Sequence, residues 1–357
     1  MKKESMKNIL VTGGCGFIGS NFIRYLLTET DFDGRIINVD KLTYAGNLEN
    51  LAGIEEAFPG RYYFSRTDIC DLMEMSAIFE MYEIDTICHF AAESHVDRSI
   101  TKPSDFIHAN VVGTFCLLEL ARLHSNKLAL FHHVSTDEVF GSLGKAGYFT
   151  ENTPYNPSSP YSASKAAADH LVRSYAITYG IPVTISNCSN NYGPYQFPEK
   201  LIPLMILNAI ENKPLPVYGE GLNVRDWLYV KDHCKAIWAI MKNGRRGETY
   251  NIGGGCEKTN IDVVRIICDF IDKILQGSDG NPRKNLITFV KDRPGHDLRY
   301  AMDFTKLKME LGWTPSKTFE TGIKETIDWY IENREWVKRV KSGEYMDWMK
   351  QQYENRQ

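Results

Sequence analysis

The strongest constraint on the fold of this chain is a glycine-rich turn between a short apolar strand and an amphipathic helix. Residues 8–12 (NILVT) are rich in β-formers, and four glycines follow at positions 13, 14, 16 and 19, leading into a helix predicted over residues 17–27. The spacing fits G-x-G-x-x-G from Gly14 and G-x-x-G-x-x-G from Gly13 equally well. In both frames the glycines let the backbone approach a pyrophosphate, whose charge the helix N-terminus stabilises. A glycine match alone is weak evidence, so the surrounding residues have to support it.

The next strand supplies that support. Residues 35–39 form a second β-rich run that ends in Asp40, 21 residues after Gly19. An acid at this place can bind the ribose hydroxyls of adenosine, although a helix or turn cap is the alternative for Asp40. The same carboxylate would repel a 2′-phosphate, and Lys41 weakens this preference only in part. The sequence therefore predicts NAD, rather than NADP, as the cofactor.

The alternation of strands and helices continues along the chain. Strands are predicted at residues 61–65, 86–90, 128–134 and 181–187, and helices at 71–82, 103–124 and from Pro160 onward. This alternation predicts an α/β fold with a Rossmann-type, doubly wound parallel sheet. Beyond residue 190, prolines at 194, 198, 203, 214 and 216 break the rhythm, which indicates a smaller C-terminal α/β lobe. Its expected helices are 203–211, 230–241, 261–274, 305–311 and 319–333, and its expected strands are 216–218 and 249–252.

A tyrosine and a lysine share one face of the helix that begins at Pro160. Tyr161 and Lys165 are four residues apart, which places them one helical turn from each other. A phenol titrates near pH 10, so Tyr161 needs a nearby cation to act as a base, and both Lys165 and the nicotinamide of NAD⁺ can serve. The Y-x-x-x-K spacing alone can arise by chance or from helix packing. Together with the dinucleotide turn it predicts transfer of a hydride from a sugar carbinol to NAD⁺.

Two adjacent acids follow the apolar strand at residues 128–134, in the sequence Ser135-Thr136-Asp137-Glu138. Two solvated acids in a turn are the plain alternative. Once a carbinol is oxidised to a ketone, however, one carboxylate can remove the neighbouring proton while a carboxylic acid donates to a departing hydroxyl. The pair thus predicts elimination of water, and the chemistry alone leaves open which acid has which role. Neighbours on a strand point to opposite faces, so both acids can serve one sugar only if the strand ends before them.

Several segments resemble those of the extended short-chain dehydrogenase/reductases, and within them those of the dTDP-glucose 4,6-dehydratase family. The resemblance covers about residues 8–329 and is carried by the segments VTGGCGFIGS, DKLTYAGN, AAESHVDRSI, STDEVFG, YSASKAAAD, NCSNNYGPYQFPEKLIPL, RDWLYVKDH and DRPGHDLRYAMD. It implies that Tyr161, hydrogen-bonded to Thr136, is the base for the C4 hydroxyl, with Lys165 beside it. It also implies that Asp137 is the acid at the C6 hydroxyl and Glu138 the base at C5. The expected reaction is conversion of dTDP-glucose to dTDP-4-keto-6-deoxyglucose, with NAD reduced and reoxidised within one turnover.

The resemblance also implies the ligand-binding residues. Those expected to hold NAD, from the glycine turn and from the resemblance, are Gly13, Gly16, Phe17, Ile18, Gly19, Asp40, Lys41, Thr43, Asp68, Ile69, Ala91, Ala92, Ser94, Tyr161, Lys165 and Asn191. Those expected to hold the substrate are Ser94, Thr136, Asn190, Lys200, Leu201, Pro216, Tyr218, Arg225, Asn260, Asp292, Arg293 and His296. Arg225 suits a diphosphate because guanidinium binds phosphate through two hydrogen bonds; its alternative is a salt bridge with Asp226. Asp68 could equally cap the next helix, and Lys200 and Asn260 could be solvated surface residues. Ala109 and Phe140 depart from the family pattern without removing a catalytic group.

Three segments follow from this interpretation. Residues 1–190 are expected to form the NAD-binding Rossmann domain, which also carries the catalytic residues. Residues 191–334 are expected to form mainly a sugar-nucleotide-binding lobe, some segments of which can return to the first domain. Residues 335–357 are expected to form a C-terminal extension, which is either a docked helix or an oligomer contact.

Composition excludes several other classes. The net charge of −4 comes without a basic stripe, so nucleic acid is not an expected partner. No apolar run of about 18 residues is expected to cross a membrane. The eight cysteines are scattered without C-x-x-C, and the nine histidines lack a metal-binding spacing, which favours buried thiols, a cytoplasmic location and no metal. A homodimer is expected, as in the family that the chain resembles.

Two other functions remain open at this point. The first is another NAD-dependent sugar-nucleotide enzyme of the same fold, a 4-epimerase or a decarboxylase, which needs the Tyr161–Lys165 pair but not the two acids. The second is a catalytically silent NAD-binding regulatory module. The sequence does not distinguish a thymidine from a uridine nucleotide, since the two bases differ by one methyl group.

Overall fold

A seven-stranded parallel sheet forms the centre of the molecule, as the strand–helix alternation predicts. The computed structural model describes residues 6–275 and 281–341 of the chain. The order of the strands is β10-β6-β5-β4-β1-β2-β3. Their bounds are β1 Asn8–Thr12, β2 Arg35–Val39, β3 Tyr62–Ser65, β4 Thr86–His89, β5 Leu130–Thr136, β6 Val183–Cys188 and β10 Thr249–Ile252. The order reverses at β1, which makes the edge beyond β1 and β4 the expected ligand site of a doubly wound sheet.

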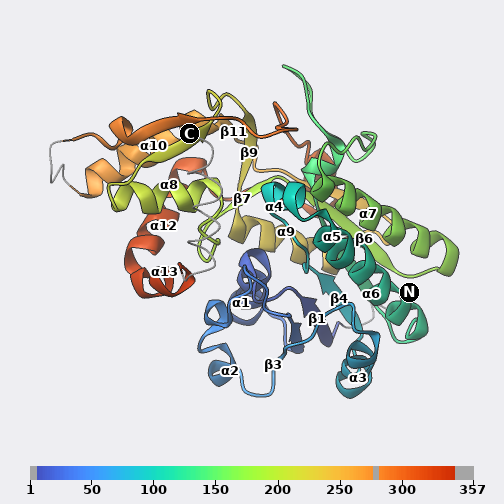
Figure 1. Cartoon of the computed structure of the whole chain (residues 1–357). Helices are drawn as coiled ribbons and strands as arrows, with labels where there is room; N and C mark the ends of the chain where they lie inside the picture. Colours follow the sequence, from blue (N-terminus) through green and yellow to red (C-terminus); the bar gives the residue numbers. More distant parts are fainter. Residues whose placement is uncertain (1–5, 276–280, 342–357) are drawn as a thin grey trace.

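Helices cover both faces of this sheet because successive strand residues point in opposite directions. In β1, Ile9 and Val11 pack into one core with α1 (Phe17–Glu29) and α9 (Val230–Asn243). Leu10 packs into the other core with α3 (Leu72–Tyr82), α6 (Gly113–Leu123) and α7 (Pro160–Tyr179). Figure 1 shows these two layers of helices around the sheet. The Rossmann-type fold is thereby confirmed.

A smaller lobe stands beyond the carboxyl ends of the strands and has its own apolar core (Figure 1). It contains a three-stranded sheet of order β11-β9-β7 and the strand pair β12-β8. The bounds are β7 Asn190–Tyr192, β8 Leu215–Tyr218, β9 Val224–Tyr229, β11 Glu257–Thr259 and β12 Ile287–Val290, with the helices α8 Leu201–Ile210, α10 Asn260–Ile274, α12 Phe319–Glu332 and α13 Arg334–Val340. The chain also returns from this region to the large sheet, because β10 pairs with β6 and α11 (Thr305–Leu311) packs beside it. The division at residue 190 therefore stays a prediction.

The helix expected at residues 103–124 is present but is not uniformly α-helical. It consists of α5 (Pro103–Phe106), a π-helical turn η2 (Ile107–Val112) and α6. This turn contains Asn110, whose amide donates to the carbonyl of Glu93 and to Ser164 Oγ and accepts from the Glu93 backbone N–H. A π-turn of this kind often marks a functional site, and here it fixes the segment that follows β4.

The same helix corrects one expectation. By length and composition alone, residues 103–123 could cross a membrane, which contradicts the expectation that no such apolar run exists. Half of this apolar stretch is buried inside the protein, where α6 packs against α3 and α7. It is therefore a core helix of the fold, and its remaining apolar face points outward.

Candidate active site

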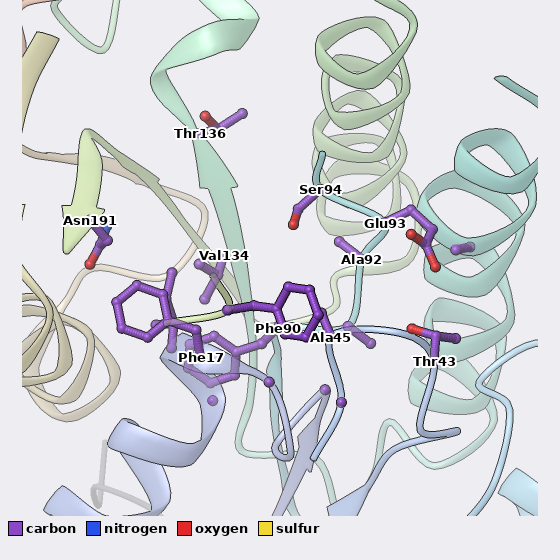
Figure 2. Close-up of a pocket in the computed structure, with 18 of the residues that line it drawn as sticks. Phe17, Thr43, Ala45, Phe90, Ala92, Glu93, Ser94, Val134, Thr136 and Asn191 are labelled. Carbon is purple, nitrogen blue, oxygen red and sulfur yellow. The ribbon is translucent and has the colours of Figure 1, made fainter. Parts of the chain in front are cut away.

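A cavity of about 310 Å³ lies beyond the carboxyl ends of the central strands. Figure 2 shows that its walls come from several elements: Phe17 from α1, Val134 and Thr136 from β5, and Ser94 from the segment after β4. All sixteen residues expected to hold NAD line this one cavity. Parallel strands bring their carboxyl ends to one edge of the sheet, which explains why positions as distant as Gly13 and Asn191 meet there.

The glycine-rich turn leaves room for a ligand where side chains would not fit. Gly13 has φ +70°, and a Cβ atom on it would lie 2.7 Å from the backbone of Ala91. A Cβ on Gly19 would lie 2.4 Å from the carbonyl oxygen of Gly13, so α1 can approach the turn only because residue 19 is glycine. The cradle formed by the turn and by the N-terminus of α1 fits the pyrophosphate of a dinucleotide.

Asp40 lies in the cavity wall next to this cradle. Its two carboxylate oxygens accept hydrogen bonds from the backbone N–H groups of Cys15 (3.0 Å) and Leu42 (2.8 Å). Burial raises the pKa of Asp40, while these two backbone donors oppose the rise. Lys41 forms a half-exposed ion pair with Asp68, with a distance of 3.1 Å from Nζ to Oδ2. Asp68 also accepts from the backbone of Cys70 and lies in the cavity wall. The N-cap of α3 is Asp71, whose side chain accepts from the backbone of Met73 and Glu74, so the alternative that Asp68 caps this helix is wrong.

The strand that precedes Asp137 and Glu138 ends before these two acids, as is required if both are to face one sugar. β5 stops at Thr136, and residues Asp137–Phe140 form a 3₁₀ turn, η3. Thr136 caps this turn, because its Oγ1 accepts a hydrogen bond of 3.2 Å from the backbone of Glu138. Both Asp137 and Glu138 line the cavity as a result. The change from strand to 3₁₀ turn is the local feature that brings both acids to one side.

The two acids have different electrostatic surroundings. Asp137 is almost fully buried (2% exposed), and its Oδ2 has no hydrogen-bond partner within the described part of the chain. Burial and the charge of Glu138 raise the pKa of Asp137 well above its ordinary value. Burial also raises the pKa of Glu138, but the cations Arg293, Lys200 and Arg225 oppose that rise. The proton is therefore favoured on Asp137 and the negative charge on Glu138, which is the arrangement of an acid beside a base.

Tyr161 and Lys165 face the same cavity from the first two turns of α7. The helix starts with Pro160 and a capping box between Ser159 and Ser162, which fixes the position of Tyr161. Burial and the charge of Glu138 raise the pKa of Tyr161 well above 10, whereas a hydrogen bond with Thr136 lowers it. The phenolate thus needs positive charge nearby. Lys165, whose Nζ donates to the carbonyl of Val134 at 2.9 Å, lies one helical turn away.

A buried network behind Lys165 has no counterpart in the sequence-based prediction. Asp169 is fully buried and accepts hydrogen bonds from Ser135 Oγ (2.9 Å) and Tyr155 OH (2.7 Å), and its Oδ1 lies 3.1 Å from His133 Nε2. Burial lowers the pKa of Lys165, and the charge of Asp169 opposes this effect. Asp169 therefore helps to keep the buried lysine protonated. Its position four residues after Lys165, on the same helix face, was the available signal.

The residues expected to bind the substrate fall into two groups. Four of them, Ser94, Thr136, Asn190 and Lys200, line the cavity. Lys200 Nζ donates to the carbonyl of Ser94 at 3.0 Å, and Asn190 Oδ1 is buried without a hydrogen-bond partner among the described residues. The other eight lie outside the cavity wall, in or beside the smaller lobe: Leu201, Pro216, Tyr218, Arg225, Asn260, Asp292, Arg293 and His296.

Several residues of this outer group are joined by Asp97, which lies on the short helix α4 (Val96–Thr101) after β4. Tyr218 OH donates to Asp97 Oδ2 at 3.0 Å, and Arg293 Nη1 lies 3.4 Å from Asp97 Oδ1. His296 Nδ1 lies 2.6 Å from Asp292 Oδ1 within the same loop. The two contacts of Asp97 link the lobe to the segment that follows β4 of the large sheet.

Arg225 is buried at the start of β9. Its guanidinium donates to the carbonyl oxygens of Val224 (2.8 Å) and Asp297 (3.0 Å) and stacks on the ring of Tyr300. Asp226 accepts from the backbone of Gly254 and Cys256 instead of pairing with Arg225. The charge of Arg225 therefore acts on the acid pair rather than on its sequence neighbour.

Two further acidic or aromatic residues near the site were not predicted. Glu199 lines the cavity, is 4% exposed and pairs with Arg98 at 3.2 Å. Tyr300, which stacks on Arg225, is buried and its OH donates to Asp297 at 2.5 Å. Glu199 immediately precedes the predicted substrate residue Lys200, which was a signal for it, whereas Tyr300 reaches the site only through the tertiary fold.

Comparisons with known proteins agree with this geometry. Residues 10–326 match the family model described as GDP-mannose 4,6 dehydratase. The chain is 54% identical to dTDP-glucose 4,6-dehydratase of Salmonella typhimurium, an alignment that covers 98% of this chain and 99% of the relative. It superposes on the crystal structure of dTDP-glucose 4,6-dehydratase from Bacillus anthracis in complex with NAD, with a TM-score of 0.84, 48% identity, and coverage of 94% of this chain and 99% of that one.

Two other solved structures define the limits of the likeness. DesIV of Streptomyces venezuelae, a dTDP-glucose 4,6-dehydratase with NAD and TYD bound, has a TM-score of 0.85, 46% identity, and coverage of 93% and 99% of the two chains. UDP-glucose 4-epimerase of Thermotoga maritima has a TM-score of 0.81 but only 28% identity, with coverage of 92% and 99%. The fold is thus shared with epimerases, whereas the higher identity is with dehydratases. The chain belongs to the nucleotide-sugar 4,6-dehydratase family of the extended short-chain dehydrogenase/reductases.

Proposed function

We propose that this chain converts dTDP-glucose to dTDP-4-keto-6-deoxyglucose, with NAD as a cofactor that is regenerated in every turnover. The observation that carries the proposal is the pair Asp137–Glu138 at the end of β5, which faces the cofactor cavity with opposed protonation states favoured on its two members. Epimerases and decarboxylases of the same fold do not need such a pair. A silent NAD-binding module would have no use for Tyr161 and both acids together. The dehydratases among the relatives support the same substrate.

NAD supplies the oxidation and the later reduction: it accepts the hydride from C4 and returns it to C6. Tyr161, oriented by Thr136 and assisted by the charge of Lys165, removes the proton of the C4 hydroxyl. Glu138 removes the C5 proton, which the C4 ketone has made acidic. Asp137 donates its proton to the C6 hydroxyl, which leaves as water and creates a C5–C6 double bond. Hydride addition at C6 and return of a proton to C5 then complete the 4-keto-6-deoxy sugar.

The remaining contacts to the sugar nucleotide come from the lobe. In this proposal residues 1–190 bind NAD and carry the catalytic groups, and residues 191–334 bind most of the nucleotide. Lys200, Arg225 and Arg293 supply positive charge around Glu138, and this charge also suits a diphosphate. Asn190 has a buried oxygen on the cavity wall that a substrate hydroxyl can satisfy. The thymine methyl adds only about 1 to 3 kcal/mol in an apolar pocket, so a measurable but limited activity on the uridine nucleotide is expected.

The chain is further proposed to work as a cytoplasmic homodimer. Apolar side chains are exposed along one face of the helix from Pro103 to Leu123 and at the end of α7, including Phe115 (41%), Leu123 (65%) and Ile177 (85%). A second copy of the same face would cover them. All eight cysteines are free thiols, which suits a reducing compartment. A light-scattering mass of two chains that falls to one chain in Phe115→Glu supports the dimer. A mass of one chain in the wild type refutes it.

The function is tested with purified protein and dTDP-glucose, with UDP-glucose as the comparison. The expected product is the 4-keto-6-deoxy sugar nucleotide, identified by mass and NMR, without a net increase in NADH absorbance. Stoichiometric accumulation of NADH would contradict the internal return of the hydride. A C4 epimer with the mass of the substrate would favour the epimerase alternative instead.

A further inference from the structure

The C-terminal helix α13 contacts the loop that closes the adenosine side of the cofactor cavity. This loop contains Thr43, Ala45 and Gly46 in the cavity wall and then forms a 3₁₀ turn, η1 (Leu48–Leu51); Figure 2 shows Thr43 and Ala45 at the cavity. Two contacts join α13 to η1. Trp336 Nε1 donates to Asn50 Oδ1 at 2.9 Å, and Arg339 Nε donates to Glu49 Oε2 at 2.7 Å.

Asn50, which accepts the hydrogen bond from Trp336, also contacts the glycine-rich turn. Its side chain is buried (1% exposed), and its Nδ2 donates to the carbonyl oxygen of Cys15 at 2.8 Å. The backbone N–H of Asn47 donates to the same oxygen at 3.0 Å. Arg24 of α1 holds Asn50 from another side, because its Nε donates to the Asn50 carbonyl at 2.7 Å. The side chain of Asn50 therefore hydrogen-bonds both to the glycine-rich turn and to α13.

The other side of Trp336 is fixed to the smaller lobe. Its ring packs at 5.0 Å from that of Trp329 in α12 and at 6.2 Å from that of Tyr195. Tyr330 of α12 packs on Trp336 and donates to the carbonyl of Gln196, a residue of the cavity wall. Trp336 is only 6% exposed in this aromatic cluster. Trp336 thus links Asn50, beside the glycine-rich turn, to the aromatic cluster that Tyr330 connects to Gln196 in the cavity wall.

We propose that α13 acts as a latch that holds NAD in the enzyme, with the bond from Trp336 to Asn50 as its main contact. Departure of the dinucleotide requires the loop of residues 43–51 to move away from the glycine-rich turn. That movement has to break the bond to Trp336 and leave the buried oxygen of Asn50 unsatisfied. The role rests on the proposed function, in which NADH has to stay bound until its hydride returns to the sugar. The proposal also assigns a function to α13, which contains the described part of the C-terminal extension, without the need for a second chain.

The test measures the release of NAD from the holoenzyme without any sugar nucleotide. Released NAD is captured by excess alcohol dehydrogenase and ethanol and is followed as NADH. In Trp336→Phe, which keeps an aromatic ring but removes the indole N–H, NAD release becomes about 10-fold faster, because a buried acceptor loses its partner. The matched control is Trp329→Phe, the same change in the same cluster but away from Asn50, and its release rate stays within about 2-fold of the wild type.

Saturating NAD restores the turnover number of Trp336→Phe to within about 2-fold of the wild type, so the effect lies in the affinity for NAD and not in the chemical steps. Equal release rates in the wild type and in Trp336→Phe overturn the proposal, as do equally fast rates in both tryptophan variants. If Trp336→Phe does not fold, the half-exposed ion pair between Arg339 and Glu49 provides the test. Arg339→Gln removes this pair and is expected to release NAD about 2-fold faster than the wild type. An unchanged release rate in Arg339→Gln overturns the proposal. The measurements of NAD release do not depend on dehydratase activity.

Discussion

Exchanging each acid of the pair for its neutral isostere separates the roles of Asp137 and Glu138. Asp137→Asn and Glu138→Gln preserve the shape of the side chains, so both variants are expected to fold and to bind NAD. The surroundings of the two acids favour a proton on Asp137 and a charge on Glu138. We therefore expect Asp137→Asn to retain removal of the C5 proton but to lose protonation of the C6 hydroxyl. Glu138→Gln is expected to lose removal of the C5 proton.

The size of the effect follows from the proton that each group transfers. A positioned acid or base contributes about 10²- to 10⁴-fold to a rate, which corresponds to about 3 to 5 kcal/mol of activation free energy. Each variant should lose overall turnover by this factor. Oxidation at C4, which depends on Tyr161, should change by less than about 10-fold in both.

The assay follows three events in one experiment in deuterium oxide. Transient NADH absorbance reports oxidation at C4, incorporation of deuterium at C5 reports the base, and mass spectrometry reports the loss of water. Asp137→Asn is predicted to form NADH and to exchange the C5 proton but to eliminate water slowly. Glu138→Gln is predicted to form NADH but to be slow both in exchange at C5 and in the elimination of water. Normal C5 exchange in Glu138→Gln, together with its loss in Asp137→Asn, would reverse the two roles and refute the electrostatic argument.

Three other perturbations test separate parts of the account. Gly19→Ala should weaken NAD binding by at least about 10-fold, because its Cβ would lie 2.4 Å from the carbonyl oxygen of Gly13. Gly16→Ala should weaken NAD binding less, because its Cβ would lie 3.2 Å from the same oxygen. Equal dissociation constants of the two variants in a fluorescence titration would contradict this. Tyr161→Phe should abolish both NADH formation and C5 exchange, since no ketone forms, and surviving exchange would exclude the phenol as the first base. Burial lowers the pKa of His133 to about 4 from an unfolded value near 6.5, so the unfolded chain binds this proton first and stability is lost as the pH falls from 6.5 to 4. Between pH 6.5 and pH 4, the loss of unfolding free energy measured with urea should be about 3 kcal/mol smaller in His133→Gln than in the wild type. An equal loss in both proteins would show that the histidine does not titrate in this way.

The part of the fold that follows a simple rule could be predicted from the sequence. The alternation of apolar strands and amphipathic helices from Asn8 to Cys188 corresponds to β1 to β6, because each element is long enough to show its period. The cofactor residues then fall in one cavity as a consequence of parallel pairing. The alternation of side chains along a strand predicts that β5 ends before Asp137 and Glu138 if both acids serve one sugar, and β5 does end at Thr136.

The smaller lobe was harder to predict for physical reasons. β11 is only three residues long, and in β9 the buried charges Arg225 and Asp226 interrupt the apolar pattern. Their burial depends on partners distant in sequence, such as Asp297 for Arg225 and Gly254 for Asp226. The π-turn at residues 107–112 also contains a contact distant in sequence, since Asn110 hydrogen-bonds to Glu93 in the segment between β4 and α4.

Some site residues show their role mainly in the tertiary fold. Asp169 and Glu199 have a local signal in their positions next to Lys165 and Lys200, whereas Tyr300 reaches the site only through the fold; each is buried beside a charge. The strand ends and the glycine turn locate the cavity, whereas its electrostatics come from residues that only the three-dimensional arrangement brings near.

The central claim is that one hydride leaves C4 and returns to C6 of the same sugar within a single turnover. Its most direct test is a crossover experiment with an equal mixture of unlabelled dTDP-glucose and dTDP-glucose that carries deuterium at C4 and a heavy-isotope label elsewhere in the sugar. The account predicts that the deuterium appears at C6 of product molecules that also carry the heavy label, and in no others. Deuterium in free NADH, in solvent or in product without the heavy label would contradict internal hydride return.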